Sequence, residues 1–421
     1  MLKRLKLKSE FTKNVLTLMT GSTIAQAIPI AISPILTRIY SPEDFGVLAL
    51  YMSVAVFVST AATGKYELAI MLPRKDSDAF NIVWLSILIT FFIASIILIA
   101  VSIFNVKIAS LLGHPEIAYL LYLLPISVLL TGLYQSLNFW MTRKKQFKNV
   151  SISRIVQSAT GSASNLGLGF MGFGGIGLIV SGMTGQFIGT LFLAKVTLKE
   201  DSKYINSINR IKSLAMIKKY KKLPLITLPN SLIDSFRLSG ISILIARYFS
   251  TATLGQFSLA WKMVQMPMGL IGAAIAQVFF QKLSSSNKSE FYYIIIQFLR
   301  KASLISAPVF LLLYFFSVEI FEFVFGDQWV LAGEAASTMT LWLFLNFMTS
   351  PLSIIYVILN KQEILFMFAI VYMVVPLGII LLFHNQSFIY VLSLVSYSMS
   401  ILLVLFIIGT LSIIKKIKQE V

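Results

Sequence analysis

The chain has 421 residues, of which 57% are hydrophobic and 12% are charged. A soluble globular domain has about 25% charged residues, so this composition excludes an ordinary soluble domain. The net charge of +18 would suggest a nucleic-acid partner in a soluble protein, but in a membrane protein it reflects basic loops, and no nucleic-acid partner is predicted. The absence of cysteine excludes disulfides, thiolate metal sites and cysteine nucleophiles.

Apolar runs recur from one end of the sequence to the other. A run of about 20 residues crosses the ~30 Å hydrocarbon core of a bilayer. We predict twelve membrane-spanning helices, at residues 14–37, 44–64, 80–104, 117–141, 150–170, 175–195, 224–247, 254–280, 302–320, 329–352, 363–383 and 388–413. The ninth has a candidate earlier start, because FYYIIIQFLRKASLIS is apolar on both sides of Arg300 and Lys301. The sequence therefore predicts an all-α polytopic membrane protein.

Most of the lysines and arginines lie in alternate connections. These are the N-terminus, the connection after the second run, the RKKQFK segment after the fourth run, residues 195–222, the connections after the eighth and tenth runs and the C-terminal tail. The opposite connections hold only Arg38, Lys107 and Arg247. Because loops rich in Lys and Arg stay on the cytoplasmic side, both termini are predicted to be cytoplasmic.

The longest connection divides the chain into two halves. It is basic, and it is too short to be a soluble domain. We therefore predict a six-helix N-terminal lobe at residues 1–195, a cytoplasmic connector at 196–223 and a six-helix C-terminal lobe at 224–421.

The two halves share a weak internal repeat. LTRIYSPEDFGVLALY (36–51) aligns with IARYFSTATLGQFSLA (245–260) at a constant offset of 209 residues. The identical pairs are Arg38 and Arg247, Ser41 and Ser250, Gly46 and Gly255, and Leu50 and Leu259. Each copy connects the first and second helix of its half. Parallel repeats of this kind predict two six-helix bundles around a central cavity, as in alternating-access transporters.

The first ninety residues resemble the start of a Wzx-type polysaccharide flippase. The similarity is carried by NVLTLMTGSTIAQAIPIAISPILTRIYSPEDFG and VLALYMSVAVFVSTAATGKYELAIMLPRKDSDAF, with ILNKQE and RKKQFK as supporting features. That family belongs to the MOP superfamily, which also contains MATE exporters and lipid II flippases. The resemblance implies a flippase that moves undecaprenyl-diphosphate-linked oligosaccharide across the bacterial inner membrane, for O-antigen, capsule or exopolysaccharide synthesis, alongside other polysaccharide-assembly proteins. The chain has no G-x-x-x-x-G-K-[ST] motif, which agrees with transport without ATP hydrolysis.

The first two predicted spans of the second half contain four candidate site residues: Asn230, Asp234, Arg237 and Lys262. Asn230, Asp234 and Arg237 share one helix face at 100° per residue. Asp234 lies about 15 Å along its helix, and Lys262 about 12 Å along the next one. An ionised group at such a depth costs about 2.5–3.5 kcal/mol, so a functional role is the default interpretation.

We predict substrate binding by Arg237, Lys262 and Asn230, with Arg154 as the candidate from the first half. This cationic cluster suits the diphosphate of a carrier lipid. Asp234 is the candidate group for coupling to Na⁺ or H⁺; no other cofactor is predicted. Two structural alternatives stay open: an intrahelical ion pair between Asp234 and Arg237, and a position of Arg154 in the basic cytoplasmic rim.

Other polar features have structural interpretations. Amides within the runs are candidates for contacts with sugar hydroxyls or for bonds between helices; they are Gln26, Gln135, Asn138, Asn165, Gln186, Gln277 and Asn346. Lys65 and Glu67 are interpreted as a solvated loop pair, with an inner gate as the alternative. The segment LGLGFMGFGGIGLIVSGMTG (166–185) lies between two runs, which favours a tight turn with small-residue packing over a nucleotide-binding loop.

Two other functions compete with transport of a lipid-linked oligosaccharide. A MATE-like exporter of organic cations needs anionic cavity residues, and Asp234 is the clearest carboxylate within a run. A membrane polysaccharide polymerase or ligase generally has a sizeable outer loop with catalytic Arg or His, whereas the outer connections here are short and His114 and His384 lie in loops. No catalytic or metal-binding residue is predicted, and the chain is expected to be a transporter and not an enzyme.

Overall fold

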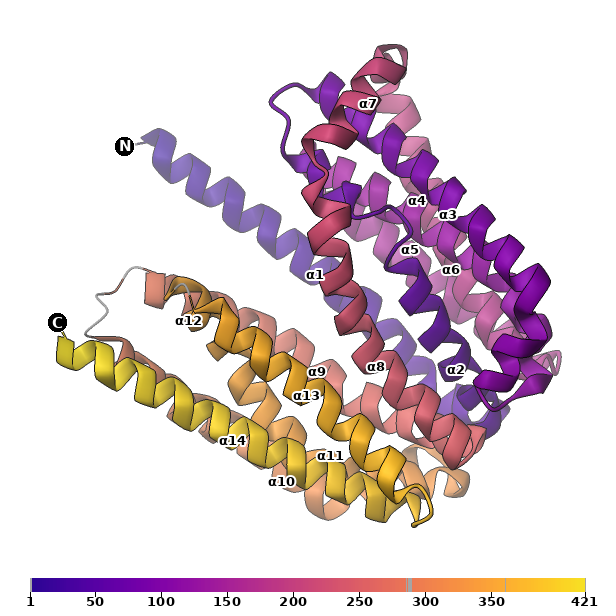
Figure 1. Ribbon diagram of the computed structural model, residues 1–421, viewed down its shortest axis with the longest axis vertical. Coiled ribbons are helices and arrows are strands. Elements are labelled where there is room, and N and C mark those ends of the chain that lie inside the picture. Colours follow the sequence, from indigo (N-terminus) through magenta and orange to yellow (C-terminus); the bar gives the residue numbers. More distant parts are fainter. Residues whose placement is uncertain (1, 285, 287–289, 360, 421) are drawn as a thin grey trace. The chain divides into compact units, whose positions relative to one another are not determined.

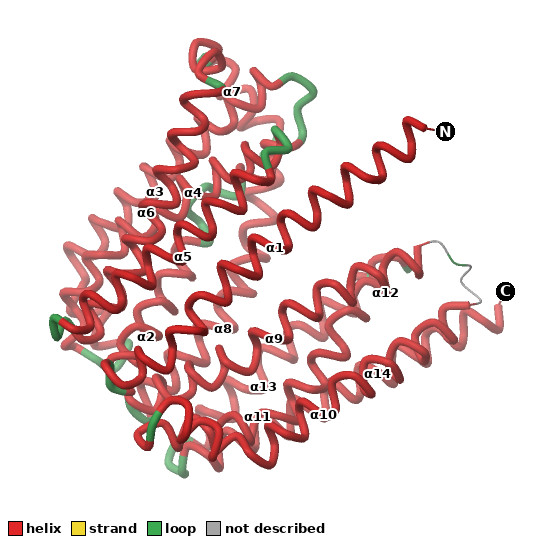
Figure 2. Tube along the Cα trace, turned by 180° about the vertical axis from the view of Figure 1, so that it is seen from behind, coloured by secondary structure: helices red, strands yellow, loops and turns green. Residues whose placement is uncertain are grey.

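The computed structural model describes residues 2–284, 286, 290–359 and 361–420. Within these ranges the regular structure is helical and contains no strand (Figure 2). Twelve described helices have 18 residues or more: α1 Leu2–Ile39, α2 Pro42–Ser59, α3 Asp76–Leu111, α4 Leu124–Arg143, α5 Phe147–Phe170, α6 Gly174–Glu200, α8 Leu228–Tyr248, α9 Thr251–Ser284, α10 Phe291–Phe325, α11 Val330–Thr349, α13 Gln362–Phe383 and α14 Phe388–Glu420 (Figure 1).

Each predicted run corresponds to one of these helices. The ninth run begins early, because α10 starts at Phe291 and continues through Arg300 and Lys301. Nine segments of the described chain are long and apolar enough to cross a membrane; the long helices outside that set are α5, α8 and α9. The prediction of an all-α, multi-pass membrane protein is confirmed.

Short helices fill several connections. They are η1 Tyr66–Met71, η2 Pro115–Leu123, η3 Ser202–Ser207, α7 Arg210–Lys219, the π-helical turn η4 Leu223–Thr227, η6 Asp327–Trp329, η7 Ser350–Leu352 and α12 Ser353–Ile358. The predicted connector therefore folds into η3 and α7, and α7 lies beside the start of α3 (Figure 1).

The chain forms two compact units, which divide between Arg247 and Tyr248. We call them unit 1 and unit 2. In unit 1, α4 and α6 end at the side where α3 and α5 begin, and we call that side the basic end because it carries RKKQFK and α7. The boundary differs from the predicted connector at 196–223, because the contacts of α8 group it with unit 1. Two serines on α8 mediate part of that packing, as described below.

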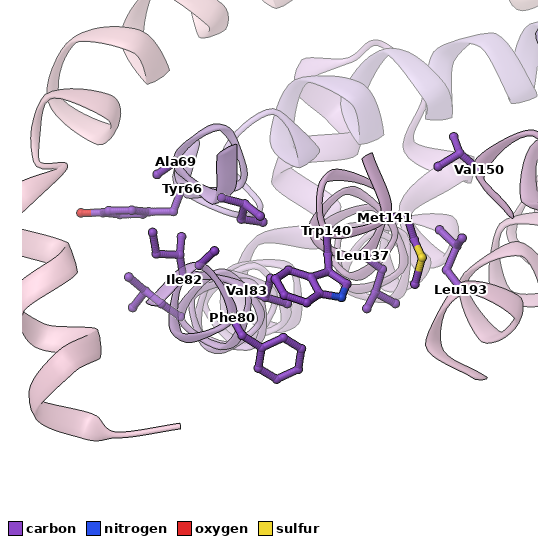
Figure 3. Close-up of a cluster of buried hydrophobic side chains, with 13 residues drawn as sticks. Tyr66, Ala69, Phe80, Ile82, Val83, Leu137, Trp140, Met141, Val150 and Leu193 are labelled. Atoms are coloured by element: carbon purple, nitrogen blue, oxygen red, sulfur yellow. The ribbon is translucent and has the colours of Figure 1, made fainter. Parts of the chain in front are cut away.

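An aromatic core lies near the basic end of unit 1. Trp140 is fully buried, and its ring meets Phe80 edge to face at 5.0 Å and Tyr204 at 5.5 Å. Figure 3 shows Trp140 between Phe80 and Leu137. The indole N–H donates to Asp201 Oδ2 at 2.9 Å, so the one polar atom of this ring is satisfied.

A salt-bridge network also lies at the basic end of unit 1. Asp76, the first residue of α3, accepts from Arg143 Nε at 3.0 Å and from Lys144 Nζ at 2.8 Å. Tyr204 of η3 donates to the same carboxylate at 3.2 Å. The hydrogen bond with Asp76 raises the pKa of Lys144 above its usual value of 10.5. This network therefore links η3, in the segment between the two predicted lobes, to α3 and to the end of α4.

The sequence repeat is also a repeat of local structure. Helix α1 ends at Ile39 and α2 begins at Pro42; adding 209 to each number gives Tyr248 and Thr251, where α8 ends and α9 begins. The aligned serines have the same role: the Ser41 hydroxyl accepts from the Asp44 N–H at 3.2 Å, and the Ser250 hydroxyl accepts from the Thr253 N–H at 2.9 Å. Both copies therefore use serine to cap the helix that follows.

Glycines bring α5 and α6 close together. A Cβ on Gly185 would lie less than 3.0 Å from the Gln157 carbonyl oxygen, so a side chain there would force the helices apart. The turn between these helices contains Gly172 and Gly174 with φ of 76° and 55°, values that favour glycine. The predicted tight turn with small-residue packing is confirmed.

Candidate functional site

A cavity of about 460 Å³ lies within unit 1. Its walls come from α2, α4, α5 and α6 and from the loop before η1. The lining residues are Leu48, Tyr51, Met52, Ala55, Val56, Ser59, Thr60, Lys65, Ser127, Thr131, Gln135, Gln157, Ile179, Gly182, Met183 and Gln186. This volume falls in the range of about 300–1,000 Å³ that is typical of small-molecule sites.

The polar groups of the cavity are mostly amides and hydroxyls. Gln186 Nε2 donates to Thr131 Oγ1 at 3.0 Å, which connects α6 to α4. The amides of Gln135 and Gln157 form no side-chain hydrogen bond with the described part of the chain. The lining contains no Asp or Glu. Its chemistry is therefore that of a neutral hydrogen-bonding surface with one cation.

That cation is Lys65, which has an unusual backbone conformation. Its φ of 64° lies in the left-handed region, which non-glycine residues seldom adopt and which asparagine and glycine tolerate best. The half-buried Lys65 side chain lines the cavity. No described carboxylate lies within salt-bridge distance of its ammonium group.

Glu67 lies two residues further on but has a different environment. It is only 4% exposed, and it accepts a hydrogen bond from the Thr63 hydroxyl. The interpretation of Lys65 and Glu67 as a solvated pair is therefore wrong for Glu67. The backbone folds back through the Lys65 position into η1, which places the carboxyl group inside unit 1.

Helix α8 contacts α2 through small polar residues. Ser235 hydrogen-bonds Thr60 at 2.7 Å, and Ser239 donates to the Ser53 carbonyl at 2.8 Å. At 100° per residue, Asn230, Asp234 and Arg237 lie about 200–260° around the helix from Ser235. The predicted polar face of α8 thus lies on the side away from α2, and the side chains of Asn230 and Asp234 are exposed.

The other two predicted site residues lie on separate helices. Arg154 is half-buried on α5 and donates to Ser22 of α1 at 2.6 Å, so its described bond is with α1 and not with α8. Lys262 lies on α9 in unit 2, about 16 Å along the helix at 1.5 Å per residue. The substrate role of these residues stays a prediction.

The amide candidates fall into distinct environments. Gln135 and Gln186 line the cavity, and Gln186 also bonds another helix. Asn138 and Asn165 have buried Oδ1 atoms without a described hydrogen-bond partner. The side chain of Gln277 lies outside the described residues. Gln157 and Lys65 were not among the sequence candidates for substrate contact, because nothing in the linear pattern relates α5 to the loop after α2.

No metal site is found among the residues that the structure describes, since no group of three or more His, Cys, Asp or Glu side chains could hold an ion there.

Comparisons with known proteins give consistent results. The family model described as "Polysaccharide biosynthesis protein" matches residues 35–334. The succinoglycan biosynthesis transport protein ExoT of Rhizobium meliloti is 20% identical over 334 residues. That alignment includes 78% of this chain but only 65% of the relative, so the chain spans about two-thirds of the length of the curated protein it matches.

Solved structures with a similar fold are membrane transporters. An inward-facing multidrug resistance MATE family transporter of the MOP superfamily superposes with a TM-score of 0.65, at 14% identity and 95% coverage of both chains. A MOP superfamily transporter from Pyrococcus furiosus, whose structure is described as having a binding pocket of reverse polarity, gives a TM-score of 0.56 at 15% identity, with 96% coverage of both chains. At these identities the similarity shows a MATE-like fold.

Proposed function

This chain belongs to the polysaccharide biosynthesis protein family, and on that premise we propose that it is a flippase for lipid-linked oligosaccharides. Its substrate is an undecaprenyl-diphosphate-linked repeat unit, which it moves across the bacterial inner membrane by alternating access without ATP hydrolysis. Both termini are cytoplasmic in this proposal, and other polysaccharide-assembly proteins supply and consume the substrate.

The observation that carries the proposal is the carboxylate-free, amide-lined cavity inside a MATE-like fold. Sugar hydroxyl groups both donate and accept hydrogen bonds, and so do glutamine amides. A transporter of organic cations needs negative charge where the cation binds, because burying an unpaired cation is costly. The cavity of unit 1 supplies amides and a lysine instead, which favours a glycan with an anionic group.

The site residues predicted from the sequence complete the proposal. Arg237 and Lys262 are the proposed contacts of the carrier-lipid diphosphate, with Asn230 and Arg154 as further polar contacts. Asp234 is the proposed site of Na⁺ or H⁺ coupling. Because intramembrane charges are costly, their retention supports a function in transport.

The test is genetic complementation in a strain that lacks its own flippase and therefore its surface polysaccharide. Wild-type protein restores the polysaccharide, and Arg237→Ala/Lys262→Ala does not, while membrane levels of the variant equal those of wild type. Lys219→Ala, an exposed residue of α7, is the matched control and retains activity. If the double variant produced wild-type levels of polysaccharide, the proposed diphosphate contacts would be refuted.

The alternative function is MATE-like export of organic cations. The MATE-like fold favours it, and the cavity lining opposes it. Accumulation of a fluorescent organic cation in cells with and without the protein separates the two. Equal accumulation, together with restored polysaccharide, excludes the exporter.

A further inference from the structure

We propose that the cavity of unit 1 is a saccharide subsite with two chemically different parts. The amides of Gln135, Gln157 and Gln186 bind sugar hydroxyl groups, and the Lys65 ammonium binds an anionic oxygen of the same ligand. This inference rests on the proposed function and assigns part of the substrate to residues outside the predicted charged cluster.

The amide part is built to accept a hydrogen-bonding ligand. A glutamine side chain offers two N–H donors and two carbonyl lone pairs. Those of Gln135 and Gln157 have no described side-chain partner, and Gln186 uses one donor for Thr131. All three residues are partly exposed, so a ligand rich in hydroxyls can bond several of these amide groups at once.

The two parts lie at a similar depth in the bundle. Gln135 lies eight residues before the end of α4 at Arg143, and Gln157 lies ten residues after the start of α5 at Phe147. At 1.5 Å per residue both are about 12–15 Å from the basic end. Lys65 follows Gly64, where a Cβ would lie 3.6 Å from the Ile89 side chain, and Ile89 is thirteen residues, about 20 Å, after the start of α3. One saccharide can therefore contact both the amides and the ammonium group.

Lys65 is placed where a structural lysine is not expected. The left-handed backbone costs about 1–2 kcal/mol for a residue other than glycine. No described carboxylate compensates its charge, because Glu67 is buried and bonded to Thr63. A cation in the wall of a polar cavity, without a described carboxylate partner, is suited to a carboxylate or phosphate ligand.

The cavity wall offers a direct test in Gly182. A Cβ at this position would have no atom within 4 Å, and Gly182 lines the cavity, so Gly182→Leu is expected to add side-chain volume there. Gly167 on α5 has equally open surroundings but does not line the cavity. Gly167→Leu is therefore the matched control, because both variants exchange a helical glycine for leucine.

The experiment measures ligand binding to the purified full chain in lipid nanodiscs by saturation-transfer NMR titration. The probes are maltotriose as a neutral saccharide, glucuronate as a carboxylate and inorganic diphosphate. Gly182→Leu is expected to abolish maltotriose binding, and Gly167→Leu to retain it. Gln157→Leu weakens maltotriose binding about fivefold, the effect of one neutral hydrogen bond.

Lys65→Asn tests the cationic part of the subsite. Asparagine tolerates the left-handed backbone, so the variant removes the charge and keeps the loop conformation. It is expected to weaken binding of an anionic probe at least about tenfold and to leave maltotriose unchanged. A loss confined to glucuronate identifies a sugar carboxylate as the source of the anion, and a loss confined to diphosphate identifies the carrier-lipid diphosphate.

Three results would overturn the proposed subsite. The wild type could fail to bind maltotriose, Gly182→Leu could bind maltotriose with the affinity of the wild type, or Lys65→Asn could bind both anionic probes with unchanged affinity. Complementation by wild type in the same study keeps the proposed function separate from this inference. Normal complementation by wild type, together with unchanged maltotriose binding in Gly182→Leu, would refute only the subsite. If the probes bind as expected but wild type does not restore the polysaccharide, only the proposed flippase function is refuted.

Discussion

The hydrogen bond between Trp140 and Asp201 should be a measurable part of the stability of unit 1. The Trp140→Phe substitution keeps an aromatic ring against Phe80 and Tyr204 but removes the N–H that donates to Asp201 at 2.9 Å. Asp201 is only 3% exposed, so water cannot readily replace the donor. The remaining described cation near it is Lys144, at 3.9 Å.

The expected loss follows from that geometry. A hydrogen bond to a charged group contributes about 1.5–3 kcal/mol, and we expect Trp140→Phe to destabilise the protein by that amount. Trp140→Ala also removes a fully buried ring and leaves a cavity, which raises the loss to about 3–5 kcal/mol or more. Apparent melting temperatures should therefore rank wild type above the Phe variant and the Phe variant above the Ala variant.

The assay is thermal unfolding of purified protein in detergent at one fixed scan rate, because unfolding of a large membrane protein is often irreversible. Trp84→Phe is the matched control: Trp84 is 38% exposed, so its exchange should change stability by less than about 0.5 kcal/mol. In an Asp201→Ala background, Trp140→Phe should cost much less than in wild type. An unchanged melting temperature for Trp140→Phe, or an equal loss in the Asp201→Ala background, would refute the reasoning.

Three further expectations concern packing, capping and pH. A Cβ on Gly132 would lie less than 3.0 Å from Thr90, so Gly132→Ala should lower stability by about 1–3 kcal/mol in the same melting assay, with partial recovery when Thr90 is also replaced by Ala. Loss of either helix cap, in Ser41→Ala or Ser250→Ala, should cost about 0.5–2 kcal/mol, and equal melting temperatures for wild type and both variants would contradict the shared capping role. The hydrogen bond with Asp76 raises the pKa of Lys144, so its contribution is complete below its usual pKa of about 10.5 and is lost as pH rises through the higher folded value. Melting temperatures measured from about pH 8 to 12 should fall less steeply for Lys144→Met than for wild type.

Much of the helical architecture follows from local features of the sequence. The length of each apolar run and the turn residues between runs determined all twelve long helices, because these properties act within one segment. The repeat was visible for the same reason: Ser41 and Ser250 cap helices through backbone groups only three residues away. The early start of α10 at Phe291 was also readable from the apolar residues before Arg300.

The tertiary structure alone decided the lining of the cavity and the environment of Glu67. The cavity combines Lys65 with Gln135, Gln157 and Gln186, which belong to four separate segments and share no sequence pattern. Sequence patterns report which residues of one helix share a face, but not which faces of different helices meet. Lys65 and Glu67 show the limit most directly, since two charged neighbours in a loop turn out to be a cavity cation and a buried acid. The sequence thus determined where the helices are, and packing determined what they enclose.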